Sequence, residues 1–220
     1  MRREIKFEIT LEEYNRIYNT LNKFIEKDKN TKRDDKYSIK TIYYDNIYNQ
    51  LLNENIDGLI HRKKFRIRMY NNDKSTIFLE KKEKIKDVIC KKREKISYED
   101  VLLLCNNDLD NFNLTSDLRK ELYIDIRTKL LKPIIIVEYD RIAFDNKTMN
   151  FRITLDSKLG KSDNIHDFFN ISKRNENVYI LEIKYSDCLP KIIVDSLNIS
   201  SQRQGISKYK NMRLSKRLIN

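Results

Sequence analysis

The feature that most constrains the fold is an alternation of charged and apolar residues that recurs in short segments along the chain. Residues 4–9 begin the series, with Glu4 and Lys6 on one parity and Ile5 and Phe7 on the other. Because successive side chains of a strand point to opposite faces, such a segment is predicted to be a β-strand with one apolar and one charged face. Further strands are predicted at residues 37–44, 61–70, 76–83, 88–96, 133–141, 151–156 and 178–185.

Helical signals occupy the stretches between these strands. Thr10 and Glu13 form a capping box ahead of apolar residues at helical spacing. Further helices are predicted at residues 49–55, 97–104, 116–131, 190–197 and 207–218. No linker or repeat interrupts the pattern, so we interpret residues 1–220 as a single α+β domain.

Composition excludes several classes of protein. No apolar run approaches the roughly 20 residues needed to cross a bilayer, and no signal-peptide core follows the N-terminus. Three cysteines without a CxxC pair, together with two isolated histidines, fit neither a disulfide framework nor a zinc site. We therefore expect a chain without a membrane segment in a reducing cytoplasm. The net charge of +12 favours an anionic partner only weakly.

The charged faces carry a more specific signal than the net charge. Glu-x-Lys pairs recur on three predicted strands, basic-x-basic pairs on two more, and single arginines on another two: Glu4/Lys6, Glu80/Lys82, Glu182/Lys184, Arg66/Arg68, Lys91/Arg93, Arg141 and Arg152. Each strand alone fits a solvated sheet face. If the strands close into a barrel, however, the cations converge on a lumen that needs a polyanion such as phosphate. Carboxylates among them could hold a divalent metal.

The order of these segments resembles the VTC domain, the polyphosphate polymerase branch of the triphosphate tunnel metalloenzymes. The motifs that carry the resemblance run in family order across nearly the whole chain: residues 3–7 (REIKF), 41–46 (TIYYDN), 64–68 (KFRIR), 78–82 (FLEKK), 91–93 (KKR), 138–144 (EYDRIAF), 151–156 (FRITLD), 181–185 (LEIKY) and 207–209 (SKY). The resemblance implies an eight-stranded antiparallel β tunnel with a charged lumen and flanking helices.

The resemblance also implies roles for individual residues. Phosphate contacts are expected from Lys6, Arg66, Arg68, Lys82, Lys91, Arg93, Arg141 and Arg152, and Lys208 is expected to assist transfer together with the two arginines Arg66 and Arg68. Glu182 would hold Mn²⁺ or Mg²⁺, with Glu4 and Glu80 as possible further ligands, and Tyr139 would stack on the nucleotide base. Shared parity with Glu80 and Arg93 favours Lys82 over Lys81 and Lys91 over Lys92.

One departure discriminates among possible activities. Hydrolytic relatives carry Glu-x-Glu-x-Lys near the N-terminus, whereas this chain has Arg2-x-Glu4-x-Lys6. The lost carboxylate favours a polymerase that moves the γ-phosphate of ATP onto polyphosphate. A tripolyphosphatase or nucleoside triphosphatase, and a non-catalytic polyphosphate binder, remain alternatives. Nucleic acid is disfavoured because no reader motif is present, and the SPX domain and membrane segments of eukaryotic VTC proteins are not expected. The sequence does not specify an oligomeric state.

Overall fold

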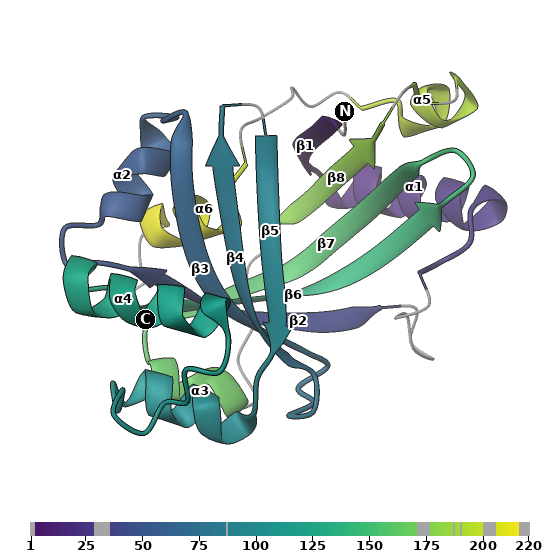
Figure 1. Cartoon of the computed structure of the whole chain (residues 1–220). Helices are drawn as coiled ribbons and strands as arrows, with labels where there is room; N and C mark the ends of the chain where they lie inside the picture. The colour runs from purple at the N-terminus through teal and green to yellow at the C-terminus, as the bar shows by residue number, and fades with distance from the viewer. Residues whose placement is uncertain are drawn as a thin grey trace. The chain divides into compact units, whose positions relative to one another are not determined.

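The computed structural model describes residues 3–28, 36–86, 88–170, 177–186, 188–189, 191–199 and 206–215. Arg2 and the predicted helix positions Pro190 and 216–218 lie outside these residues. Hydrogen bonds join eight strands in the order β1-β8-β7-β6-β2-β3-β4-β5, and each pair with a defined register is antiparallel (Figure 1).

The strands follow the predicted positions closely. They are β1 (Arg3–Ile9), β2 (Tyr37–Asp45), β3 (His61–Tyr70), β4 (Ile77–Ile85), β5 (Val88–Lys95), β6 (Lys132–Asn146), β7 (Phe151–Ser162) and β8 (Tyr179–Tyr185). The helices are α1 (Leu11–Phe24), α2 (Gln50–Ile56), α3 (Tyr98–Cys105), α4 (Asp117–Lys129), α5 (Lys191–Leu197) and α6 (Lys208–Leu214), and one 3₁₀ turn, η1 (Ile165–Phe169), was not predicted.

The chain divides into two compact units, and each has its own core. Unit 1 comprises residues 1–38, 139–160 and 174–206. Its apolar cluster joins the inner stripe of α1 to the apolar faces of β7 and β8, with Ile17 and Leu21 packed in the same cluster as Ile153 and Leu181. The capping box predicted at Thr10 and Glu13 is present at the start of α1.

Unit 2 comprises residues 39–138, 161–173 and 207–220. The odd-numbered residues of β3 and β4, including Phe65, Ile67 and Leu79, pack with the apolar residues of α3 and α4. The even-numbered residues of the same strands point to the opposite face. The alternation in the sequence therefore separates a helix-covered core face from a charged face in this unit.

Some predicted boundaries were wrong. β6 and β7 run to Asn146 and Ser162, beyond the predicted ends at residues 141 and 156, where the alternation used for the prediction stops. α4 ends at Lys129 because Leu130 adopts a left-handed conformation, with φ of 54°. α6 ends at Leu214, ahead of the predicted residue 218. The interpretation as a single domain stays a prediction.

None of the helices in the described ranges is both long enough and apolar enough to cross a membrane.

Candidate functional site

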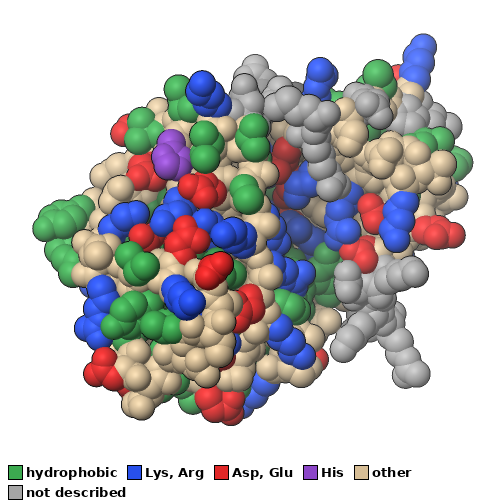
Figure 2. All heavy atoms as spheres, in the orientation of Figure 1, with side chains coloured by type: hydrophobic (Ala, Val, Ile, Leu, Met, Phe, Trp, Pro, Cys, Tyr) green, Lys and Arg blue, Asp and Glu red, His purple; other side chains and the backbone are tan. Residues whose placement is uncertain are grey.

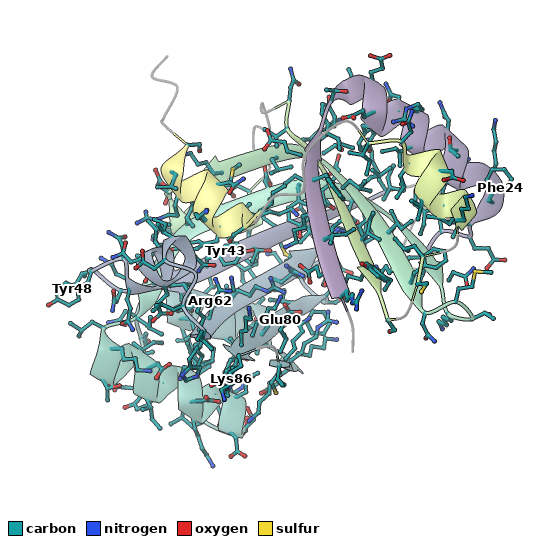
Figure 3. All side chains as sticks on the ribbon, turned by 90° about the horizontal axis from the view of Figure 1, so that it is seen from above. Phe24, Tyr43, Tyr48, Arg62, Glu80 and Lys86 are labelled. Atoms are coloured by element: carbon teal, nitrogen blue, oxygen red, sulfur yellow. The ribbon has the colours of Figure 1, made fainter. Side chains whose placement is uncertain are left out.

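The charged face of unit 2 gathers four cations around one carboxylate. We call this group the cationic cluster; it consists of Arg66 and Arg68 on β3, Glu80 on β4, and Lys91 and Arg93 on β5. Arg66 places Nε 2.7 Å and Nη2 2.6 Å from Glu80 Oε2, and Lys91 Nζ lies 2.7 Å from Oε1. Arg93 Nε lies 3.4 Å from Glu80 Oε1, and Arg68 Nη1 lies 3.9 Å from Glu80 Oε2. Glu80, labelled in Figure 3, is the hub of the group.

Strand register produces this arrangement directly. Glu80 is paired across the sheet with Arg66 on one side and with Arg93 on the other. Directly opposite residues of antiparallel strands share a face and lie close together. One parity step away, Lys81 turns to the helix-covered face, where its Nζ lies 2.6 Å from Glu121 Oε1. Lys82 therefore shares the Glu80 face and is paired with Lys91. Its predicted phosphate contact stays a prediction.

The electrostatics of the cationic cluster favour an anionic ligand. The Glu80 side chain is fully buried. Burial alone raises the pKa of its carboxyl, but the charges of Arg66 and Arg68 and the hydrogen bond from Lys91 outweigh it and lower the pKa to about 2. Burial lowers the pKa of the Lys91 ammonium, and repulsion from the two arginines adds to that shift against the opposing effect of Glu80. Four cations thus share one carboxylate, an excess that phosphate oxygens can neutralise.

An aromatic contact brings α6 to this face. Tyr43 on β2 is paired with Arg66, and its ring centroid lies 5.3 Å from that of Tyr209 on α6. The Tyr209 hydroxyl donates a hydrogen bond to Oδ2 of the buried Asp45. Figure 3 shows Tyr43 beside α6. Because Lys208 precedes Tyr209, this docking holds Lys208 at the charged face.

The pKa of the Tyr43 hydroxyl also indicates that Lys208 lies near Arg66 and Arg68. Burial would raise the pKa of its hydroxyl, yet the charges of Arg66, Arg68 and Lys208 lower that pKa below its usual 10. Lys208 therefore acts on the same phenol as the two arginines. Sequence reasoning did not single out Tyr43, although Thr41 to Asn46 was one of the recognised motifs. Its parity with Thr41, which is paired with Arg68, was the available signal.

A second group, which we call the mixed cluster, lies on the charged face of unit 1 and holds equal numbers of cations and carboxylates. Its members are Glu4 and Lys6 on β1, Arg141 on β6, Asp156 on β7, and Glu182 and Lys184 on β8. Lys6 Nζ lies 2.8 Å from Glu4 Oε1. Register places Lys6 opposite Glu182 and Glu4 opposite Lys184. The mixed cluster is therefore balanced in charge, unlike the cationic cluster.

Asp156 is a member that the sequence analysis did not assign to the site. Arg141 donates from Nε and Nη2 to its two carboxylate oxygens at 2.6 and 2.7 Å. Burial would lower the pKa of the Arg141 guanidinium, but Asp156, Tyr139 and Glu182 together hold that pKa well above its usual value. The forked pair fixes the Arg141 side chain in position. The signal for Asp156 in the sequence was its place in the strand predicted at residues 151–156, where it has the same parity as Arg152.

The carboxylates differ in their fitness for a metal. Glu182 is 6% exposed and contacts Lys184, with Arg141 Nη2 3.6 Å from its Oε2. Within the described residues no group of three His, Cys, Asp or Glu side chains could hold a metal ion. Magnesium, however, is commonly bound through one or two carboxylates plus substrate phosphates, and Glu182 and Glu4 offer two carboxylates on the paired strands β8 and β1. The four cations around Glu80 disfavour the metal role predicted for that residue.

Two predicted residues occupy more enclosed surroundings. Arg152 contacts Asp28 and places Nη2 3.3 Å from the Tyr37 hydroxyl. The Tyr139 ring is only 2% exposed, and the guanidinium carbon of Arg141 lies 5.2 Å from its centroid. A nucleotide base could stack on Tyr139 only after Arg141 moved, so that role stays a prediction.

Comparison with known proteins identifies the family and the fold. The VTC domain model matches residues 1–215. Among solved structures, a proposed adenylate cyclase from Bacillus halodurans is similar to this chain, with a TM-score of 0.56 at 14% identity. The match covers 84% of this chain and 80% of the cyclase chain. The PH1819 and PH1012 proteins of Pyrococcus horikoshii have TM-scores of 0.51 and 0.50 at 14% and 15% identity. The match to PH1819 covers 97% of this chain and 98% of the PH1819 chain. The match to PH1012 covers 94% of this chain and 97% of the PH1012 chain. No curated protein sequence matches the chain. These likenesses confirm the predicted fold class, an α+β chain with an eight-stranded antiparallel sheet.

Proposed function

Since the chain belongs to the VTC domain family, we propose that it is a metal-dependent polyphosphate polymerase that transfers the γ-phosphate of ATP onto a polyphosphate chain. The observation that carries the proposal is the cationic cluster, whose excess positive charge matches a triphosphate. The replacement of the first acidic position by Arg2 supports a polymerase over a hydrolase.

In this proposal the cationic cluster binds and orients the phosphates. Arg66 and Arg68 offer forked donors from adjacent positions of one strand face, while Lys91, Arg93 and Lys82 add charge from β4 and β5. Glu80 holds Arg66 and Lys91 in place before the substrate arrives, because both side chains contact its carboxylate. Preorganised cations of this kind stabilise charge without reorganisation during transfer.

Lys208 acts on the moving phosphoryl group in this scheme. Its place at the start of α6, held near Tyr43 by Tyr209, aims an ammonium at the charged face from outside the strands. Charge on the transferred group spreads over its oxygens in the transition state. We therefore assign Lys208 to stabilising that charge, with Arg66 and Arg68 holding the donor.

The mixed cluster supplies the proposed metal site and further phosphate contacts. Glu182, with Glu4, would hold Mn²⁺ or Mg²⁺, and the ion would neutralise phosphate charge when bound. Lys6, Arg141 and Arg152 are assigned as additional phosphate ligands, and Tyr139 as the base contact. ATP as donor and the three free cysteines favour a cytoplasmic setting.

One assay tests the proposal. Purified protein is incubated with ATP and Mn²⁺, and the products are separated on a polyphosphate gel. A ladder of chains is expected. Free phosphate alone would identify a hydrolase, and unchanged ATP with retained polyphosphate binding would identify a binder. The Arg66→Gln/Arg68→Gln variant, purified in the same way, is the control, and a ladder of parent intensity from it would exclude the cationic cluster as the phosphate-binding site.

A further inference from the structure

The end of unit 2 formed by β3, β4 and β5 carries apolar side chains that face solvent. We call this group the hairpin tip; its members are Leu59, Ile60, Ile85, Val88 and Ile89. Ile60 and Val88 are 65% and 68% exposed, and the other three are each close to half exposed. These large apolar side chains are exposed and are not part of the buried core. A cluster of this kind indicates an interaction surface.

Backbone pairing makes the hairpin tip contiguous. Ile85 is paired with Val88 at the end of the β4–β5 hairpin, and Ile89 is paired with Lys84. The Lys86 amide donates a hydrogen bond to the Ile60 carbonyl at 3.1 Å, which attaches the segment before β3 to the same end. Ile85 and Val88 therefore project from one face of the hairpin end and Ile89 from the other.

Basic residues surround the hairpin tip. Arg62 and Lys84 are directly paired at its base, and Lys86 is exposed at its turn. The nine residues from Lys84 to Lys92, both included, hold four lysines and one aspartate. Figure 2 shows apolar and basic side chains together at the upper end of this unit, and Figure 3 labels Arg62 and Lys86.

We propose that the hairpin tip is a membrane-docking element, which inserts its apolar side chains at the interface of an anionic bilayer while the surrounding cations contact lipid headgroups. Insertion of apolar side chains and attraction of cations to anionic lipids are each weak, but together they bind a protein stably to a membrane surface. The charge argues for this occupant over a second copy of the chain, because two copies each carrying +12 and a basic rim repel one another.

The chain contains no tryptophan, so a single introduced indole reports on the hairpin tip alone. Val88→Trp is mixed with vesicles of phosphatidylcholine or of phosphatidylcholine with phosphatidylglycerol. Its emission is expected to shift to shorter wavelength only with the anionic vesicles. Phe24→Trp, on a side chain 64% exposed at the end of α1, is the matched control and is expected not to shift.

A second experiment separates the hairpin tip from the cationic cluster, whose charges could also attract vesicles. Ile60→Ser/Val88→Ser removes apolar area without changing charge and is expected to lower partitioning onto anionic vesicles at least about tenfold. Phe24→Ser is expected to bind like the parent.

Two results would overturn the proposal. One is unchanged vesicle binding by Ile60→Ser/Val88→Ser. The other is parent protein that ignores vesicles yet self-associates in sedimentation, with self-association lost in the same variant, since the hairpin tip would then join two copies. Turnover of soluble ATP without vesicles does not depend on the hairpin tip, so either result leaves the proposed polymerase activity intact.

Discussion

Glutamates at equivalent strand positions have different surroundings in this chain. Glu80 is enclosed by four cations, Glu182 by two cations beside other carboxylates, and Glu4 lies between two lysines. The same Glu-x-Lys pattern in the sequence therefore serves two purposes. Glu80 organises cations, whereas Glu182 and Glu4 are the carboxylates to which we assign the proposed metal ion.

The low pKa of Glu80 predicts an acid dependence of stability. Its carboxyl has a usual value of 4.5 and a value of about 2 in the folded protein, so its stabilising contribution is complete above pH 4.5 and is lost as pH falls towards 2. That contribution is about 3 kcal/mol. We expect Glu80→Gln to lower the free energy of unfolding at pH 7 by about this amount and to flatten its fall between pH 4.5 and 2.

Denaturant unfolding at a series of pH values measures this effect. Glu8→Gln, which alters an exposed carboxylate on β1, is the control and should retain the acid dependence of the parent. An equally steep fall in Glu80→Gln would show that another group dominates.

The forked donors of β3 give a second prediction. Arg66→Lys keeps the charge but loses the pair of contacts at 2.6 and 2.7 Å to Glu80. We expect tripolyphosphate affinity to fall by about tenfold, a typical loss for a charge-assisted hydrogen bond. Calorimetric titration measures it, and Lys74→Arg, outside the cationic cluster, should titrate like the parent. Parent-like affinity in Arg66→Lys would mean that its charge alone suffices.

Lys208 separates transfer from binding. A contact made mainly in the transition state lowers kcat and leaves ground-state affinity nearly unchanged. We therefore expect Lys208→Ala to turn over about a hundredfold more slowly while binding ATP analogues normally, in line with the loss of one preorganised donor. Lys210→Ala, two residues along α6, should be close to neutral. If both variants behave alike, Lys208 is only one more surface cation.

At the scale of residues, the odd or even position of a charged residue in its strand was enough to predict which face of the sheet most of these residues occupy. Arg66, Arg68, Lys91 and Arg93 do converge on Glu80, because strand pairing follows from the alternation. Tyr43 and Asp156 were missed since their importance comes from partners on other strands. Sequence spacing alone does not show that Asp156 meets Arg141.

At the scale of elements, α6 depends on a small number of specific contacts. It is seven residues long, too short to be stable alone. Tyr209 anchors it to Asp45, whose carboxylate also accepts hydrogen bonds from the Leu51 and Leu52 amides at the start of α2 at 2.8 and 3.1 Å. One buried carboxylate therefore connects two helices to the end of β2.

Tyr209→Phe tests this anchor. The change removes the hydroxyl and leaves the ring contact with Tyr43, so the cost in unfolding free energy should be about 1–2 kcal/mol. Because Lys208 would be held less firmly, we expect a lower kcat with a nearly unchanged KM. Steady-state kinetics and thermal denaturation together check the prediction, with Tyr123→Phe on α4 as the control. Loss of stability without any loss of kcat would remove α6 positioning from the mechanism.

Elements were predicted well where one face is apolar and the other charged. The β3–β4–β5 meander and the capped helices α1 and α3 fall where the pattern placed them. The ends of β6 and β7 were missed because residues such as Ile142, Ala143 and Phe144 are buried in succession and carry no alternation. Burial on both sides removes the two-residue period.

At the scale of the molecule, stability rests partly on a buried ion pair that no sequence pattern indicated. Lys40 and Glu138 are both almost fully buried in unit 2, with Nζ 3.8 Å from Oε2, and Lys40 also donates to the Asn170 carbonyl. Removing one partner leaves a charge in a region of low polarity, at a cost of about 3–5 kcal/mol.

We expect Lys40→Met to lower the free energy of unfolding by that amount, and Lys40→Met/Glu138→Leu to recover much of the loss. Denaturant titration of the single and double variants measures both. Lys36→Met, at a pair in which the lysine is substantially exposed, is the control and should cost less than about 1 kcal/mol. A double variant no more stable than Lys40→Met would contradict the prediction, because the loss would then not come from the unpaired charge of Glu138.

The pairing of β1 with β8 has a kinetic consequence. Arg3 is paired with Tyr185, so residues separated by most of the described chain must meet before this part of unit 1 can form. In unit 2, by contrast, β3, β4 and β5 are joined by short turns. Contacts between distant residues form slowly, because closing a long loop costs entropy before any pairing compensates for it. We therefore expect the cationic cluster to assemble early during folding, and the strands that carry Lys6 and Glu182 to join late.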